Sequence, residues 1–138
     1  MKAVVYDFCE TRAGEICRTF LGEWKGFVVC DDYGGYKAGF TNGITEAGCL
    51  AHARRKFFDL HVSNKSQIAA QALRYISQLY DVEREVKGLS ADERRQIRQT
   101  QAKPLADAFA QWMMLQRQKV TDGSAIAKAL DCTDPIPQ

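Results

Sequence analysis

The 138-residue sequence predicts an α/β protein, with short strands and helices up to about residue 62 and an all-helical region from about residue 63 to residue 130. In the first part, runs of β-branched and aromatic residues are typical of short buried strands. In the second part, apolar residues recur at the three- and four-residue spacing of an amphipathic helix. Hydrophobic residues make up 46% of the chain, enough for a real core, so we do not expect a disordered protein.

The first part is expected to alternate strands and helices. Residues 2–8 are predicted to form a buried strand, and a strand over residues 26–31 is expected beside it in one sheet. Between them, Thr11 offers an N-cap hydroxyl for a short helix. A third strand over residues 44–48 leads into residues 49–58, whose good helix formers predict a helix.

The second part is expected to be a helical hairpin or bundle. Its first helix covers about residues 64–86, and Ser90 can cap a charged helix over residues 92–101. Pro104 is expected to open a third helix, and a short helix follows over residues 124–130. The apolar stripe of the first helix consists of Ala69, Ala72, Leu73, Ile76, Leu79 and Tyr80.

Composition excludes several classes of protein. The 19 Lys and Arg residues against 17 Asp and Glu give a formal charge of +2, which does not by itself indicate a polyanion-binding protein. Five cysteines without a CxxC pair argue against a disulfide framework or a zinc ribbon. No apolar run approaches the roughly 20 residues that span a bilayer, and no signal peptide is evident. We therefore expect a cytoplasmic protein.

Asp31 is the first candidate for a chemical role. A carboxylate at the carboxyl end of a buried strand is where an α/β site holds a metal or a substrate. The alternative is an aspartate that caps a loop, since Asp is common in turns before a Gly-Gly pair. The neighbouring Asp32 leaves the assignment between the two carboxylates open.

Cys49 and His52 form a CxxH pair where the third strand meets its helix. Two such ligands make half of a tetrahedral zinc site, and no second pair exists because Cys30 and His61 are isolated. A cysteine nucleophile would need a histidine and a third orienting group in space, which this spacing does not indicate. A structural role for Cys49 and His52 is favoured.

Arg54, Arg55 and Lys56 form a compact basic cluster that could contact phosphates. On a helix, Arg55 and Lys56 share a face with His52 and Asp59, while Leu50, Phe57 and Phe58 can reach the core. The alternative is a solvated basic face. A stripe of aromatic residues at helical spacing is expected in the core, not as a platform for bases: Tyr75, Tyr80, Phe109 and Trp112.

Three segments together resemble the insertion sequence 66 family of transposases: residues 31–37, 44–58 and 72–80, with matching order and spacing. The most specific part is the run GCLAHARRKF. The resemblance extends to residues 6–7, 24–26 and 123–130, so it covers nearly the whole chain.

This resemblance implies an RNase H-like fold in which three acidic residues hold two divalent metals, Mg²⁺ or Mn²⁺, that activate the attacking group and stabilise the leaving oxygen. Asp31 matches the second of these acids and is the expected catalytic residue and metal ligand. Asp32 stands where the family usually has glycine. Cys49 and His52 match the family's CxxH signature, which supports the core. The helical second part resembles the insertion between the second and third acids.

The sequence departs from the family at two catalytic positions. The first aspartate belongs to a strand before residues 2–8, and the final glutamate belongs to an Asn-Asn-x-x-Glu-like segment that residues 131–138 do not resemble. Those last residues have the prolines and polarity of a frayed tail. We expect a truncated or excised part of a longer transposase, inactive by itself, with Asp7 or Glu46 as poor substitutes for the missing acids.

Two functions from different classes follow from this interpretation. The leading one is an incomplete fragment of the catalytic domain of an enzyme of DNA transposition, whose intact form acts on transposon ends. Arg54, Arg55 and Lys56 are expected to contribute a phosphate contact that is independent of DNA sequence. The alternative is a regulatory or DNA-binding module that associates with the full-length transposase and modulates it. A third and weaker candidate is a metal-binding domain built on Cys49 and His52.

Overall fold

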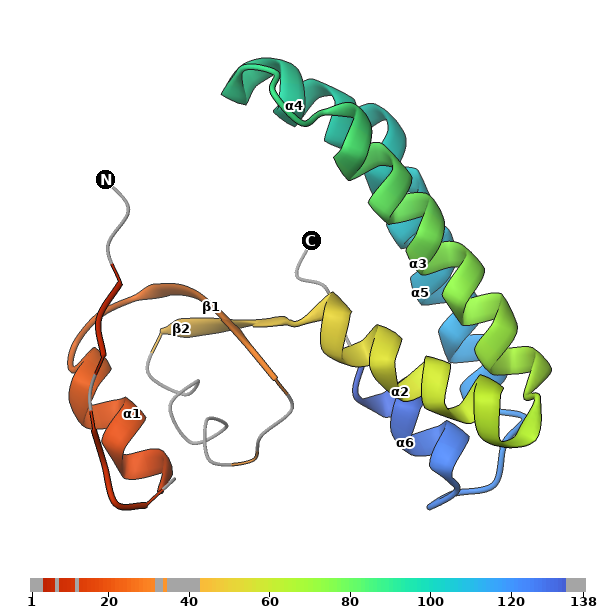
Figure 1. Ribbon diagram of the computed structural model, residues 1–138, viewed down its shortest axis with the longest axis horizontal. Helices are drawn as coiled ribbons and strands as arrows, with labels where there is room; N and C mark the ends of the chain where they lie inside the picture. The colour runs from red at the N-terminus through yellow and green to blue at the C-terminus, as the bar shows by residue number, and fades with distance from the viewer. Residues whose placement is uncertain (1–3, 7, 12, 32–33, 35–42, 134–138) are drawn as a thin grey trace. The chain divides into compact units, whose positions relative to one another are not determined.

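A computed structural model describes residues 4–6, 8–11, 13–31, 34 and 43–133. The chain divides into two compact units, an N-terminal unit over residues 1–47 and a helical unit over residues 48–136. Figure 1 labels their elements. In chain order these are α1 (Gly14–Leu21), β1 (Gly26–Cys30), β2 (Ile44–Gly48), α2 (Leu50–Asn64), α3 (Gln67–Glu85), α4 (Ala91–Ile97), the π-helical turn η2 (Arg98–Ala102), α5 (Lys103–Arg117) and α6 (Ala125–Asp131).

The N-terminal unit contains α1 and a two-stranded sheet. The predicted strands over residues 26–31 and 44–48 correspond to β1 and β2, which are neighbours in this sheet. Ala13, not Thr11, is the N-cap of α1, and the Ala13 N–H donates to Thr11 Oγ1 at 3.4 Å. The helix ends at Gly22, whose φ of 55° suits a residue without a Cβ.

The predicted first strand is wrong for the residues that the structure describes. Residues 4–6 and 8–9 are not in a strand, and β1 pairs with β2 instead. The side chains of Tyr6 and Phe8 are 93% and 89% exposed. Because β-propensity largely reflects packing on a sheet, these residues favour a strand only where a neighbouring strand or layer covers them. The short strands and helices make this an α/β chain, while an RNase H-like core stays a prediction.

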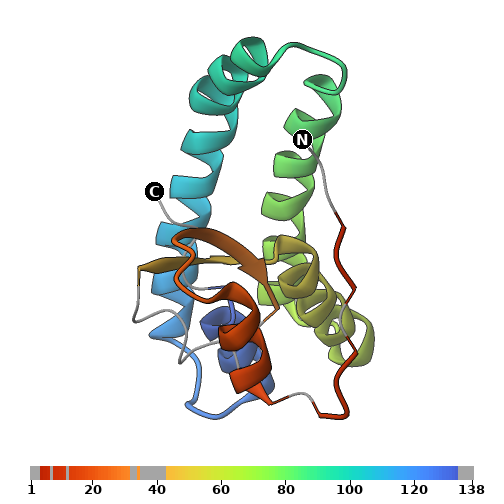
Figure 2. The same cartoon turned by 90° about the vertical axis from the view of Figure 1, so that its left-hand side faces the viewer.

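The helical unit confirms the predicted change from strands to helices. Every residue from 64 to 118 is described, and none lies in a strand. Helix α2 packs on α3 and α6, and α3 packs on α5. Figures 1 and 2 show α3 and α5 as the two arms of a hairpin joined through α4. Side chains from all of these helices except α4 form the core: Phe57, Ala69, Ala72, Ile76, Phe109, Met113, Ala129 and Leu130.

The aromatic stripe lies mainly in this core, as predicted. Phe109 is fully buried, and Tyr75, Tyr80 and Trp112 are partly buried against the core cluster. The rings of Tyr75 and Phe109 stack with centroids 5.2 Å apart, and Trp112 lies 5.5 Å from Tyr75. Such ring pairs contribute about 0.5–1.5 kcal/mol beyond the area they bury, which favours one arrangement of α3 against α5.

Pro104 lies at the start of α5, as predicted, although α5 is continuous with the helical turns before it. Helical backbone continues from α4 through η2 into α5, with Pro104 at the start of α5. A proline lacks the N–H for an α-helical bond and its ring crowds the carbonyl four residues earlier. The chain widens here into a π turn, in which the Lys103 N–H donates to Arg98 O. The Thr100 hydroxyl donates to the carbonyl oxygens of Gln96 and Ile97 nearby.

Serine side chains define where three helices begin. Ser66 Oγ accepts from Ala69 N–H at the start of α3, and Ser124 Oγ accepts from Ala127 N–H at the start of α6. Ser90 forms a complete capping box with Glu93 at the start of α4, as its position predicted. These caps satisfy N–H groups that a helix leaves without intrahelical partners.

Candidate nucleic-acid interface on helix α2

Helix α2 has a buried face and an exposed face, and adjacent residues of the sequence lie on the two faces. Ala53 and Phe57, one turn apart, are 3% and 0% exposed. Arg54 and Phe58 follow them at the same four-residue spacing, and Phe58 is 46% exposed. The prediction that Phe58 reaches the core is therefore wrong. Successive helical residues point about 100° apart, so adjacent phenylalanines can differ in environment, and here Phe57 is buried while Phe58 is not.

The basic cluster lies on the exposed side of α2. Arg54 and Arg55 are exposed, and Lys56 is half-buried. The Arg54 guanidinium carbon lies 5.8 Å from the centroid of the Phe58 ring, within the range of a cation–π contact. This contact holds the guanidinium close to an apolar surface, where its charge is less well solvated.

Within the part of the chain that the structure describes, Arg54 and Arg55 form no ion pair. Other arginines of the helical unit do: Arg98 pairs with Glu83, and Arg117 pairs with Asp122 and Asp131. Those carboxylates raise the pKa values of Arg98 and Arg117 through hydrogen bonds. The arginines of α2 therefore keep their charge available for an external anion.

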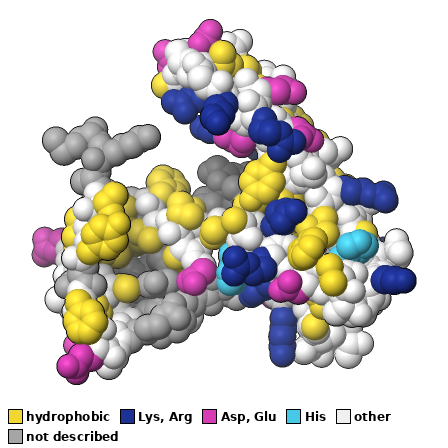
Figure 3. Space-filling model, in the orientation of Figure 1, with side chains coloured by type: hydrophobic (Ala, Val, Ile, Leu, Met, Phe, Trp, Pro, Cys, Tyr) yellow, Lys and Arg dark blue, Asp and Glu magenta, His cyan; other side chains and the backbone are white. Residues whose placement is uncertain are grey.

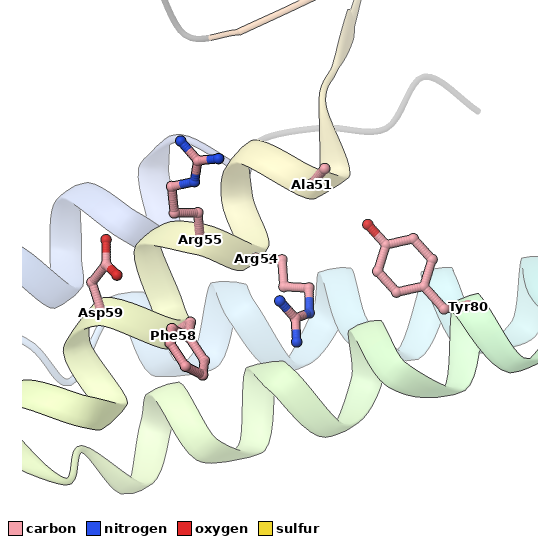
Figure 4. Close-up of a pocket in the computed structure, with 6 residues that line it drawn as sticks. All are labelled: Ala51, Arg54, Arg55, Phe58, Asp59 and Tyr80. Carbon is pink, nitrogen blue, oxygen red and sulfur yellow. The ribbon is translucent and has the colours of Figure 1, made fainter.

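An open groove lies beside these arginines, between α2 and α3. Its volume is about 650 Å³, and its lining residues are Ala51, Arg54, Arg55, Phe58, Asp59 and Tyr80. Figure 4 shows Arg54 pointing from α2 toward α3, between Phe58 and Tyr80. Arg55 and Asp59 point to the other side of α2. The groove thus joins a cation and two aromatic rings in one shallow depression.

The distribution of charge over the surface agrees with this arrangement. On the face shown in Figure 3, lysine and arginine side chains are numerous over the helical unit, with hydrophobic side chains and some Asp and Glu side chains between them. The formal charge of the whole chain is only +2. An electrostatic attraction to nucleic acid must therefore come from local clusters, of which the α2 arginines are one.

Asp31 directly follows β1, as predicted, and is half-buried. Its Oδ1 is buried and has no hydrogen-bond partner among the described residues. On the preceding residue, the Cys30 thiol donates to Glu46 Oε1 of β2 at 3.5 Å. Asp7 and Asp32, the other acids considered, lie outside the described residues.

An unpartnered carboxylate oxygen suits a metal ligand, but one carboxylate does not make a two-metal site. Among the residues in the described ranges, no three His, Cys, Asp or Glu side chains come together in a way that could hold a metal ion. The described residues alone therefore do not fit the metal pair that the resemblance implies. The assignment of Asp31 as catalytic stays a prediction.

Cys49 and His52 lie at the start of α2. Cys49 is the N-cap residue, with no hydrogen bond from its side chain to the first turn, and both residues are half-buried. Later in the same helix, His61 Nδ1 is buried and has no hydrogen-bond partner in the described part of the chain. This arrangement does not test whether the CxxH pair has a structural role or binds a metal.

A family model described as transposase IS66 family matches residues 1–134. The chain belongs to the transposase IS66 family. This membership confirms the resemblance seen in the sequence motifs and supports a function derived from transposition. DDE transposases generally use divalent metals and act on DNA. No helix among the described residues is long and apolar enough to cross a membrane.

Similar proteins come from Sinorhizobium fredii (strain NBRC 101917 / NGR234). The chain is 33% identical over 146 residues to uncharacterized protein y4hP, covering 94% of this chain and 26% of that protein. It is 32% identical to uncharacterized protein y4jD and 31% identical to uncharacterized protein y4qI, covering 95% and 92% of this chain and 27% and 25% of those proteins. The chain thus spans about a quarter of their length. No solved structure matches the chain.

Sequence reasoning selected the arginines of the groove but missed its aromatic residues. Phe58 was wrongly assigned to the core, whereas Tyr80 packs against the core as predicted and also lines the groove. The signal that could have found Phe58 is its four-residue spacing from Arg54, which places both side chains on one stripe of α2. No such local signal joins Tyr80 of α3 to this stripe.

Proposed function

We propose that this chain is a DNA-binding part of a transposase-derived protein and that α2 supplies its contact with DNA. The observation that carries this proposal is the pair of exposed arginines, Arg54 and Arg55, without a carboxylate partner among the described residues. Arginine donates several hydrogen bonds from a planar group that suits phosphate oxygens. Contacts with the phosphate backbone position a protein on DNA without reading its sequence.

The same proposal includes catalytic incompleteness. A two-metal mechanism needs several carboxylates to fix both ions, and the described residues offer Asp31 without a group of partner ligands. We infer that the 138-residue chain binds DNA and does not cleave or join it alone. In an intact enzyme of the family, Asp31 would act as one metal ligand and the α2 arginines as substrate contacts.

The test of DNA binding compares two variants with equal loss of charge. In one, Arg54, Arg55 and Lys56 are replaced by alanine; in the other, Lys87, Arg94 and Arg95 near the far end of the hairpin are replaced. We expect the α2 variant to lose most of its affinity for duplex DNA and the hairpin variant to retain most of it. Equal losses would mean that only net charge matters, and no loss in the α2 variant would refute the proposed interface.

An apolar surface favours the second candidate function, association with a full-length transposase. In the N-terminal unit, Val4, Val5, Phe27 and Val29 are each more than 60% exposed, and Ile44 is its one buried hydrophobic residue within the described ranges. We propose that these side chains form one patch, since contiguous exposed apolar surface marks protein interaction sites. Co-purification with a full-length family member, reduced by Phe27→Ser together with Val29→Ser, is the expected result. Unchanged co-purification would exclude this surface as the contact.

A further inference from the structure

We propose that the groove between α2 and α3 holds one unpaired nucleotide of a DNA strand, with its base against Arg54, Phe58 and Tyr80. This inference rests on the proposed DNA binding and adds a preference for single-stranded or unstacked DNA. The groove differs from a plain basic surface because it joins aromatic rings to a cation without a carboxylate partner among the described residues. The faces of aromatic rings gain little from the phosphates of an intact duplex, whereas they stack readily on exposed bases.

The geometry places the stacking surfaces in the groove itself. Arg54 lies over the Phe58 ring at 5.8 Å, and Figure 4 shows it between that ring and Tyr80. A guanidinium plane supported by an aromatic ring is a surface on which nucleic-acid bases stack. Tyr80, from α3, provides a second ring on the opposite side of Arg54. Its hydroxyl forms no hydrogen bond within the described part of the chain, so it can donate to a base or a sugar.

The size and exposure of the groove suit a nucleotide. Its volume of about 650 Å³ lies within the roughly 300–1,000 Å³ of small-molecule sites. Phe58 is 46% exposed, an exposure that costs free energy for a large apolar ring unless a ligand covers it. The ring also lies beside a cation, which favours a partner with both an apolar face and a negative charge.

The charges around the groove orient the bound strand. Arg55 and Asp59 both point away from α3, on the outer side of α2. Asp59 repels phosphate, so the flanking phosphates are expected to run close to Arg55 and Arg54 and away from Asp59. One groove of this size holds one base, and neighbouring bases stay outside it. The site therefore recognises a strand end or a distorted step, not a long single strand.

The test measures binding to two probes by fluorescence anisotropy. One probe is a blunt duplex, and the other is the same duplex with a short single-stranded thymine overhang at one end. We expect the wild-type chain to prefer the overhang by about fivefold or more, the effect of roughly one stacked base. For Phe58→Leu and Tyr80→Leu, the ratio of the affinities for the two probes should fall to about one. Phe58→Trp should retain it.

The controls separate this inference from the proposed function. Phe20→Leu changes an exposed phenylalanine of the N-terminal unit and should leave the preference intact. Far-ultraviolet circular dichroism confirms that each variant is folded. If the wild-type chain binds both probes equally, the nucleotide site is refuted while duplex binding stands. If it binds neither probe, the proposed function fails and this inference fails with it.

Discussion

Arg98 donates two hydrogen bonds to Glu83, from Nε to Oε1 at 2.7 Å and from Nη2 to Oε2 at 2.6 Å. This forked pair joins the π turn to α3 near the end of the hairpin, where α4 buries no residue. The hydrogen bond from Arg98 holds the pKa of Glu83 below its usual value of 4.5. Since both side chains are more than 40% exposed, the pair contributes only modestly to the free energy of unfolding, and this contribution depends on pH.

The sign of that dependence gives the first prediction. A carboxyl group with a lowered pKa in the folded state stabilises the fold above its unfolded pKa, and this contribution is lost as the pH falls through the folded pKa. Glu83→Gln should therefore lower the Tm at neutral pH, and the difference from wild type should shrink below the folded pKa of Glu83. Thermal unfolding followed by circular dichroism at several pH values measures this. Glu85→Gln, on the same helix, is the control. A Tm difference between Glu83→Gln and wild type that does not change with pH would contradict the account.

The second prediction concerns the start of α3. Ser66 Oγ accepts from the Ala69 N–H at 3.2 Å, and loss of such an N-cap typically costs about 1 kcal/mol. Ser66→Ala should lower the free energy of unfolding in urea by about that amount. Ser77→Ala, at an exposed position within the same helix, should cost nothing measurable. Equal effects of the two substitutions would show that the cap does not stabilise α3.

The third prediction uses two adjacent phenylalanines. Phe57 is fully buried in the core, so Phe57→Ala should destabilise the chain by about 3–5 kcal/mol through lost burial and the cavity left behind. Phe58 is 46% exposed, so Phe58→Ala should cost less than about 1 kcal/mol, much of it from removal of the cation–π interaction with Arg54. Urea unfolding distinguishes them. A large cost at both positions would mean that Phe58 belongs to the core.

The contrast between these two residues shows how far the sequence predicted the fold. Periodicity identified the helices of the second part because an apolar stripe that recurs over three or four turns is typical of a helix packed on a core. It could not assign Phe57 and Phe58 to different environments, because their positions depend on how α2 packs against α3 and α6. The pairing of β1 with β2 could likewise not be predicted from the sequence, since strand pairing depends on contacts between distant segments.

The same division applies to the candidate site. The cluster of Arg54, Arg55 and Lys56 is visible in the sequence because its members are adjacent. Tyr80 joins the groove only through the packing of α3 on α2, so no local pattern could place it there. Pro104 correctly predicted the start of α5, because proline favours the first helical positions, but no local pattern indicated the π turn that joins α5 to α4.

The fourth prediction is that the purified chain will not cleave or join transposon ends with Mg²⁺ or Mn²⁺. Asp31 alone leaves each ion mostly coordinated by water and poorly placed for in-line attack. The measurement is an end-cleavage and strand-transfer assay on the terminal repeats of the element, with Asp31→Ala as the control. If the wild-type chain shows metal-dependent activity and Asp31→Ala abolishes it, the chain supplies the other metal ligands from residues outside the described ranges.

The salt dependence of duplex binding tests the central claim most directly, because it reports how many phosphates α2 binds. For B-DNA, each neutralised phosphate contributes about 0.9 to the slope of log K against log salt concentration. Replacing Arg54 and Arg55 by alanine should therefore lower the magnitude of this slope by about 0.9 for each phosphate that is no longer neutralised, to a limit of about 1.8. The matched Arg94 and Arg95 double variant should keep the wild-type slope. An α2 variant with unchanged affinity and unchanged slope would contradict the account and leave these arginines as a solvated face.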